Sequence, residues 1–179
     1  METLTDATQT TEMNIVKPWT RFWARNFDML LHGIIIGAIW TFIHEDSFDS
    51  IPNDIYTVMY AIVWMMIEWG YMTKIGTTPG KFIMGIHVKT KNGERLSQDL
   101  AFKRARLVWL RGMAIGVGII QLIANYIAYK NLKNDRATTW DRDLELHVTH
   151  KQIGLFRYLL CPSFVIVFMI LVIVSAFIS

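Results

Sequence analysis

Four polar residues near the N-terminus recur at the spacing of a helix. Arg21, Arg25, Asp28 and His32 are four, three and four residues apart, so on a helix they share one face. Asp28 lies at the start of a long apolar run, where burying a carboxylate is costly unless a partner neutralises it. The nearest partner is Arg25, or Arg21 one turn earlier. Two interpretations of Asp28 stay open: an ion pair that fixes how this helix docks, or a site for a proton or a cation.

A second carboxylate, Glu68, interrupts the apolar run IYTVMYAIVWMMIEWGYMT. No basic residue lies within one helical turn of it, and the nearest is Lys74. Burial disfavours the charged form of an unpaired carboxyl group. We therefore expect Glu68 to exchange protons. The alternative is a neutral Glu68 that donates a hydrogen bond to a neighbouring helix.

Motifs for other chemistries are weak. The segment GTTPGKF resembles half a phosphate-binding loop, but it has three residues between the glycines and Phe82 after the lysine. Glu145, His147 and His150 do not have the spacing of a zinc site. Neither a Ser/His/Asp nor a Cys/His arrangement is discernible, and the one cysteine, Cys161, lies in an apolar run. We predict that the chain is not an enzyme and holds no metal and no cofactor.

Composition points to a membrane as the surroundings of these residues. Of 179 residues, 53% are hydrophobic and only 18% are charged, whereas soluble domains carry about 25% charged residues. The balance of 18 basic to 15 acidic residues requires no nucleic acid as a partner. The apolar residues gather in four long runs, at 27–43, 55–73, 112–129 and 158–179.

The runs predict membrane-spanning helices. A helix needs about 20 mostly apolar residues to cross a bilayer. The fourth run has no charge in 22 residues, whereas the third is short, with early glycines and an internal Gln121 and Asn125. The predicted fold class is an all-α membrane protein, a bundle of three to four transmembrane helices.

The basic residues predict the orientation of the chain. Three precede the first run, nine lie between runs two and three, and six lie between runs three and four. The acidic connection 44–54 has none. Basic residues near membrane ends stay in the cytoplasm, so we place the N-terminus and residues 74–111 inside. If the third run crosses, six basic residues lie outside. If it re-enters, all 18 stay inside, and we favour this arrangement slightly.

Residues 76–111 are predicted to form a cytoplasmic β-hairpin and an interfacial amphipathic helix. Alternation over 86–90 followed by Asn92-Gly93 is a strong hairpin signal. Ser97 can then cap the helix SQDLAFKRARLVWLR. Its basic face and its aromatic residues predict contact with anionic lipid headgroups. The residues expected at this lipid interface are Lys103, Arg106 and Trp109.

Several motifs follow one another in a specific order. Arg21-x-x-Ala24-x-x-x-Asp28 is followed by GTTPGKFIMGIHV, an Asn-Gly turn and a basic helix. This order, over residues 16–150, resembles the RDD family of bacterial membrane proteins, which is named for one arginine and two aspartates. The remaining segments are then a disordered tail at 1–15 and an additional C-terminal transmembrane helix at 151–179.

The resemblance implies which residues carry the signature. The arginine and first aspartate map onto Arg21 and Asp28, and Arg25 is a competing choice for the arginine. The second aspartate maps onto Asp141 in TTWDRD. Family members often carry histidine before this aspartate, where the present chain has Trp140.

The resemblance also implies a multi-pass protein of the bacterial inner membrane, with ligand transport suggested for the family and monovalent cation/proton exchange for some members. Arg104 and Arg111 are seven residues apart, so they share a helix face. One polar cluster is expected at the cytoplasmic side, in which carboxylates bind the ion or proton and basic residues are their charge partners. Its expected members are Asp28, Glu68, Asp141, Arg21, Arg25, Arg104 and Arg111.

Two functions are compatible with these residues. In the first, Asp28 and Glu68 exchange a cation for a proton across the membrane. In the second, the protein is a non-catalytic scaffold whose segment 76–111 recruits a cytoplasmic protein or anionic lipid. The expected partners are the lipid bilayer and a second copy of this chain, because four short helices leave little room for a path.

Overall fold

The computed structural model describes residues 17–43, 52–112 and 118–178. These ranges contain helices, one π-helical turn (η2) and a two-stranded sheet. In chain order the elements are α1 (Pro18–Ile43), α2 (Asn53–Lys74), α3 (Pro79–Ile83), β1 (Ile86–Thr90), α4 (Gln98–Leu107), η2 (Val108–Gly112), α5 (Gly118–Asn134), α6 (Thr139–Asp143), β2 (Leu146–His150) and α7 (Leu155–Ile178).

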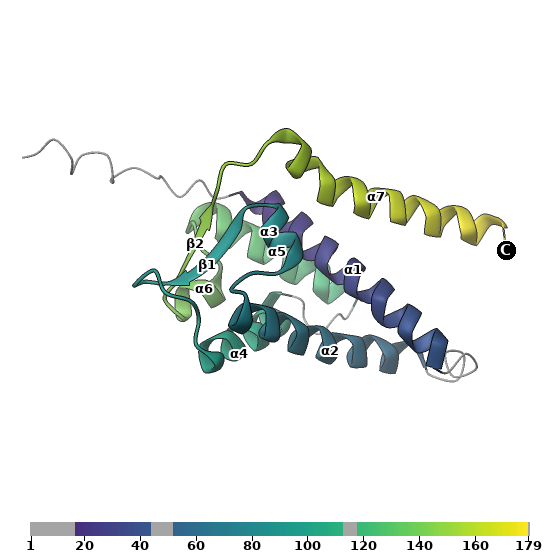
Figure 1. Ribbon diagram of the computed structural model, residues 1–179, viewed down its shortest axis with the longest axis horizontal. Helices are drawn as coiled ribbons and strands as arrows, with labels where there is room; N and C mark the ends of the chain where they lie inside the picture. The colour runs from purple at the N-terminus through teal and green to yellow at the C-terminus, as the bar shows by residue number, and fades with distance from the viewer. Residues whose placement is uncertain (1–16, 44–51, 113–117, 179) are drawn as a thin grey trace, which may run out of the picture.

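The strands and short helices gather at one end of the molecule, and the long helices extend from it (Figure 1). α1 and α7 run away from this end, which we name the strand end, and α2 runs back to it. α4 and η2 lead part of the way along the molecule, and α5 then returns. The ring centroids of Trp19 and Tyr129 lie 6.1 Å apart, which places the last turns of α5 beside the start of α1.

Two of the described helices, α1 and α7, are long and apolar enough to cross a membrane. α7 turns most of its apolar side chains outward, for example Leu171 at 60% exposure. Apolar side chains along a helix that crosses a bilayer face lipid at little cost. The structure supports the coarser part of the predicted fold class, a mostly helical fold with two helices that could cross a membrane. The bundle of three to four spans stays a prediction.

The sheet pairs two strands that are far apart in the sequence. β1 runs antiparallel to β2, with Val88 opposite Val148 and Lys89 opposite His147. The predicted β-hairpin is therefore wrong. The Asn-Gly turn does form, with Gly93 at φ 79° and its N–H donating to the carbonyl of Thr90 at 3.0 Å. The chain after it leads directly into α4, and β2 takes the place beside β1.

The β1–β2 pairing restricts the path of the third apolar run. Paired strands lie on the same side of any membrane, so the chain between 90 and 146 crosses an even number of times or not at all. A single crossing by that run, the arrangement that puts six basic residues outside, would then require a second crossing between the strands; the path of the run stays a prediction. The early glycines of this run lie partly in 113–117, outside the described residues.

The strand end is built from two similar segments. In each, a helix ends at a residue in the left-handed region, Gly76 (φ 80°) or Arg136 (φ 56°). A threonine N-cap then precedes a five-residue helix, α3 or α6. A second left-handed residue, Gly85 or Glu145, leads into β1 or β2. The equivalent valines of the two strands face each other, so a local pseudo-twofold axis passes between them.

The apolar face of α4 packs inside the protein. Ala101 and Ala105 are each 1% exposed, and α4 contacts α2 along its length. Just beyond α4, Trp109 is buried with Trp64 and Ala61. The expected lipid contact of Trp109 is therefore wrong, because this side chain packs against α2.

The opposite face of α4 is exposed, as its polarity predicts. Lys103 pairs with Asp99 at 2.7 Å, and both side chains are more than half exposed. Arg106 is also exposed. Their contact with lipid headgroups stays a prediction.

Candidate functional site

Asp28 is buried at the N-terminus of α3. It is 1% exposed and accepts hydrogen bonds from the Thr78 hydroxyl and from the Gly80 N–H, the latter at 2.5 Å. A methyl group at Gly80 would overlap the carbonyl oxygen of Ala24, so only glycine allows α3 to approach α1 this closely. Among the described residues, no arginine forms an ion pair with Asp28, so the expected pairing within α1 is wrong. A hydroxyl and a backbone amide from another element replace it.

Glu68 is not the unpaired carboxylate that its own helix suggests. Its Oε1 lies 2.5 Å from Lys81 Nζ and 3.5 Å from an Arg104 guanidinium nitrogen. Glu68 is 3% exposed, and its partners come from α3 and α4. Burial also lowers the pKa of Lys81, although Glu68 opposes this shift. Glu68 is therefore part of an ion pair, whereas the sequence predicted an unpaired carboxyl group that exchanges protons.

Asp141 is the most extensively bonded of the three carboxylates. It contacts Arg104 Nε at 3.0 Å and Arg21 at 3.1 Å, and it accepts a hydrogen bond from the Thr138 hydroxyl at 2.7 Å. Burial alone would raise the pKa of Asp141, but Arg104, Arg21 and the Thr138 hydroxyl outweigh it and hold the pKa below its ordinary value. Asp141 therefore stays ionised although it is 1% exposed.

Arg104 joins two of the carboxylates. It lies between Glu68 and Asp141 and is itself 4% exposed. Arg111 does not join it, and the expectation that the two share a face is wrong. The π-helical turn η2 changes the helix phase before Arg111, which pairs at the surface with Asp143.

Arg25 lies beside this network without an ion pair to any described residue. Its guanidinium carbon is 5.8 Å from the centre of the Trp140 ring, which is a cation–π contact. The Trp140 ring also covers Gly112, where a methyl group would lie 2.9 Å from it. Trp140 thus positions Arg25 instead of neutralising it. We name the network and this arginine together the charge cluster: Arg21, Arg25, Asp28, Glu68, Lys81, Arg104 and Asp141.

His32 connects α1 to α2 below the charge cluster. Its Nδ1 lies 2.7 Å from the Asp28 carbonyl oxygen, and its Nε2 lies 3.2 Å from the Tyr71 hydroxyl. A carbonyl oxygen only accepts, so Nδ1 carries a proton and donates it to the Asp28 carbonyl. The fourth polar residue of the N-terminal face therefore links α1 to α2 through two hydrogen bonds.

His150 of β2 lies beside Arg21 of the charge cluster. Arg21 Nε donates to its Nε2 at 3.5 Å, and its buried Nδ1 has no partner among the described residues. Burial, together with the positive charges of Arg21 and Lys17, lowers the pKa of His150 to about 4. This histidine is neutral at physiological pH.

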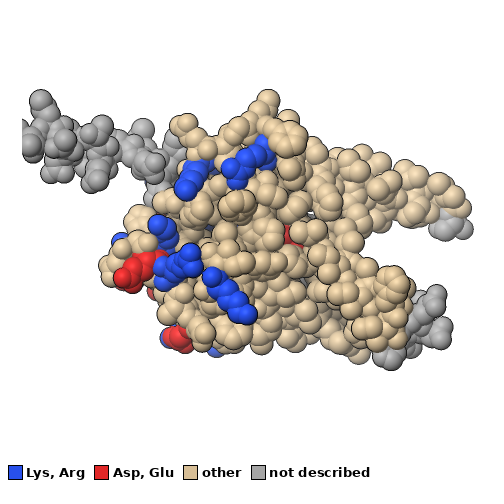
Figure 2. Space-filling model, viewed as in Figure 1, with Lys and Arg blue, Asp and Glu red and all other residues tan. Residues whose placement is uncertain are grey.

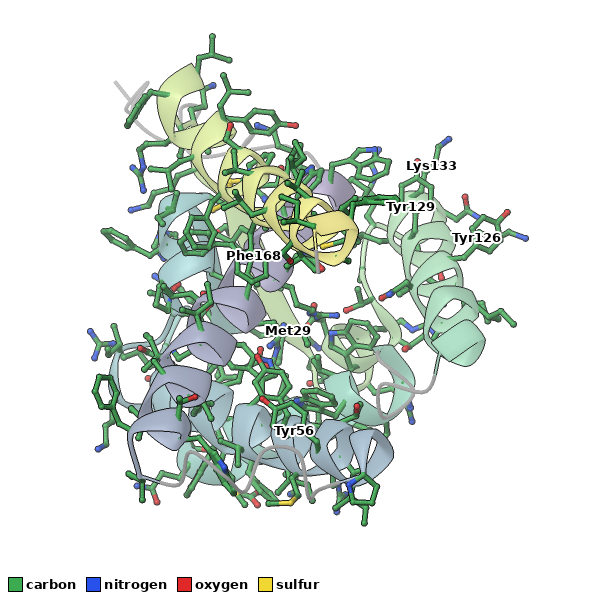
Figure 3. The ribbon with its side chains drawn as sticks, turned by 90° about the vertical axis from the view of Figure 1, so that its right-hand side faces the viewer. Met29, Tyr56, Tyr126, Tyr129, Lys133 and Phe168 are labelled. Atoms are coloured by element: carbon green, nitrogen blue, oxygen red, sulfur yellow. The ribbon has the colours of Figure 1, made fainter. Side chains whose placement is uncertain are left out.

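A cavity of about 520 Å³ lies between α1, α5 and the inner face of the sheet. Its polar lining includes Arg21, Arg25, Lys81 and Arg104, and no described carboxylate lines it. Met29 of α1 and Tyr129 of α5 lie on either side of it (Figure 3). The cations of the charge cluster thus face the cavity, and the carboxylates lie behind them.

Some site residues were not predicted from the sequence. Thr78, Lys81 and Thr138 hold the carboxylates, yet the sequence predicts only a weak phosphate loop around Thr78 and Lys81 and no role for Thr138. The signal that could have identified them is the repeated order of a threonine, a short helix and a strand with His-Val. Within the described ranges, no group of acidic residues, histidine and cysteine has the arrangement of a metal site.

Charge and apolar surface separate along the molecule. The visible lysine and arginine side chains gather at the strand end, and the opposite end shows none (Figure 2). Together with the two apolar helices, this separation is typical of a membrane protein with a charged end. More particularly, the RDD family model matches residues 15–145, and the chain belongs to the RDD family. Arg21 and Asp141, onto which the resemblance maps two of the signature residues, form an ion pair in the fold. α7 lies beyond the matched residues. No curated protein and no solved structure is significantly similar to the chain.

Proposed function

We propose that this protein moves a small solute across the bacterial inner membrane through the cavity between α1 and α5. The observation that carries the proposal is the placement of the cavity, whose charged lining residues all belong to the charge cluster. The volume of about 520 Å³ lies within the usual range of small-molecule sites, roughly 300–1,000 Å³. A buried charge cluster beside a cavity is costly to maintain for packing alone.

The proposed topology is multi-pass with a cytoplasmic N-terminus. α1, α2 and α7 cross the membrane, and the third apolar run, which contains most of α5, enters and leaves on the same side. This keeps all 18 basic residues inside, as the charge rule favours. The predicted acidic outer connection falls mostly in 44–51, outside the described residues. Labelling of single cysteines at positions 92 and 135 from the cytoplasmic side only would support this topology, and labelling of 135 from outside would contradict it.

The charge cluster supplies a way to couple the solute to a proton. Arg104 is shared by Glu68 and Asp141. A solute that draws Arg104 away from Glu68 leaves this buried carboxylate with Lys81 alone as its cation. A carboxylate in that position takes up a proton, because burial then favours its neutral form. In the expected cycle, Glu68 takes up a proton when Arg104 pairs with the solute, and it releases the proton when the solute leaves.

Cation/proton exchange by Asp28 and Glu68 has less support from the geometry. Both carboxylates are fully engaged by other groups, and neither lines the cavity. It stays a prediction that one experiment tests together with the proposal. Proteoliposomes loaded with a pH-sensitive dye are given gradients of Na⁺, K⁺ or octanesulfonate, with empty liposomes as the background.

We expect the protein to produce a solute-driven pH change that Glu68→Gln abolishes. The matched control is Lys103→Gln, an exposed position that does not contact the charge cluster. A response to Na⁺ or K⁺ alone would favour cation exchange. The proposal is lost if the parent protein gives no flux of any of these ions, or if Glu68→Gln and Asp28→Asn leave the flux unchanged.

The scaffold function has one supporting observation, the exposed polar face of α4. Deleting 76–111 would remove β1 and Lys81, so a surface variant is the better test. If the protein is a scaffold, Lys103→Gln with Arg106→Gln releases a stoichiometric cytoplasmic partner while the fold is kept. Unchanged co-purification would argue against this face as the docking surface.

A further inference from the structure

The charge cluster has one positive charge more than its carboxylates neutralise. It contains four basic residues and three carboxylates, and the surplus falls on Arg25, which has no ion pair with any described residue. We propose that the cavity binds an amphiphilic monoanion, with its charged head at Arg25 and its apolar tail between α1 and α5. This names the substrate class of the transport proposed above and rests on that proposal for movement, but not for binding.

Arg25 is placed to receive the head of such a molecule. Its side chain lines the cavity and stacks on Trp140, so its guanidinium is held in one orientation without being neutralised. Arg21 lies one helical turn away on the same wall and pairs with Asp141 through one guanidinium nitrogen. Guanidinium groups hold carboxylate, sulfonate and phosphate through paired hydrogen bonds.

The rest of the cavity is suited to an apolar tail. Its walls include Trp19 and Phe22 of α1, and Tyr126 and Leu132 of α5. Trp19 is 57% exposed and Tyr126 is 67% exposed, so these rims face the surroundings of the helices. In a bilayer those surroundings are lipid. The cavity therefore opens sideways to the membrane, and a ligand can enter with its tail in the acyl region.

Energetics favour an anion over a neutral ligand or a cation. A surplus cation in apolar surroundings is unfavourable unless a counter-charge accompanies it. An anionic head at Arg25 supplies that charge, and the cationic wall repels a positive ligand. A short anion without a tail would leave the apolar walls uncovered, so it is expected to bind far more weakly.

The test measures equilibrium binding of tritiated oleate to the purified full-length protein in dodecyl maltoside micelles at pH 8.5. We expect one saturable site, and we expect Arg25→Gln to weaken it by at least about tenfold, the effect of one lost charge-assisted hydrogen bond. Arg106→Gln, an exposed arginine on α4, is the matched control and should not change the affinity. Acetate and neutral monoolein should not compete.

A second variant covers the case in which Arg25→Gln does not fold. Ala128 of α5 lines the cavity, and Ala128→Trp fills the tail region while Arg25 is kept. It too should weaken oleate binding. Competition by phosphatidylglycerol would identify a lipid headgroup as the source of the anion, and competition by oleate alone a free amphiphile; both support the proposal.

The proposal is overturned if oleate shows no saturable site, if both variants bind as tightly as the parent, or if monoolein competes as well as oleate. The experiment uses no gradient, so it separates binding from movement. Saturable binding without flux in proteoliposomes would contradict the transport function and leave the binding site in place.

Discussion

At the scale of single residues, the charge cluster depends on groups that are shared between elements. Arg104 of α4 forms ion pairs with both Glu68 of α2 and Asp141 of α6, so it links these elements. Removing one partner of a buried ion pair leaves an uncompensated charge in low dielectric, which costs more than the intact pair contributes. Without Arg104, Glu68 keeps Lys81 and Asp141 keeps Arg21, so each carboxylate loses one of its two cations.

We expect Arg104→Met to destabilise the protein by about 3–5 kcal/mol, because Glu68 and Asp141 each lose a cation. Arg106→Met, on the exposed face of the same helix, should change stability by no more than about 0.5 kcal/mol. Thermal unfolding in detergent, followed by tryptophan fluorescence, measures both. Equal unfolding temperatures for the two variants would show that the charge cluster does not form.

His150 predicts a pH dependence of stability. Its pKa is about 4 in the folded protein and about 6.5 in an unfolded chain. Between these values the unfolded state binds more protons, so stability falls as the pH is lowered from about 6.5 to about 4. Allowing for partial exposure, the loss is on the order of 1–2 kcal/mol.

His150→Gln keeps an acceptor for Arg21 and removes the titration. Its unfolding temperature should therefore change less than that of the parent between pH 7 and pH 4.5. Asp141 does not interfere, because its pKa lies below the ordinary value and its contribution is lost only at lower pH. Parallel curves for the parent and the variant would exclude His150 as the source.

At the scale of elements, the contact between α1 and α3 is set by one glycine. We expect Gly80→Ala to destabilise the protein by about 1–3 kcal/mol or more, since the methyl group meets the Ala24 carbonyl and lies 3.0 Å from the Asp28 carboxylate. Gly70→Ala in α2 meets nothing within 4 Å and should be neutral or slightly stabilising. The comparison is made by thermal unfolding. A tolerated Gly80→Ala would mean that α3 does not dock on α1.

The elements also show what could be predicted from the sequence. The apolar runs and the Ser97 cap predicted helices that the structure contains, because these signals are local. The partner of β1 was missed, since an Asn-Gly turn is a local signal whereas pairing with β2 depends on the whole fold. The role of Glu68 was misread for the same reason, because its cations come from α3 and α4 and not from its own helix.

The candidate site was predicted by residue type more than by arrangement. Asp28, Glu68, Asp141, Arg21 and Arg104 do lie together, although the reasons differed for each. Arg111 was misplaced because a π-helical turn is not visible in the helical spacing. Whether these residues bind an ion or a proton stays a prediction.

At the scale of the whole molecule, the β1–β2 pairing joins two segments that are more than 50 residues apart in the sequence. It brings Thr78 and Thr138, the caps of two similar short helices, beside α1 and α4. It also requires both long basic segments to lie on one side. The charge cluster and the cavity follow from this single contact between distant strands.

The most direct measurement of this claim is a disulfide crosslink between the strands. In a Cys161→Ala background, Lys89→Cys and His147→Cys place exposed thiols at opposed positions of β1 and β2. Opposed residues of antiparallel strands have Cα atoms about 4.5–5.5 Å apart, which suits a disulfide. The control is Lys89→Cys with Leu96→Cys, the pair that a local hairpin would bring together. We predict rapid oxidation of the 89/147 pair in membranes and little of the 89/96 pair. Oxidation of the 89/96 pair alone would contradict the account.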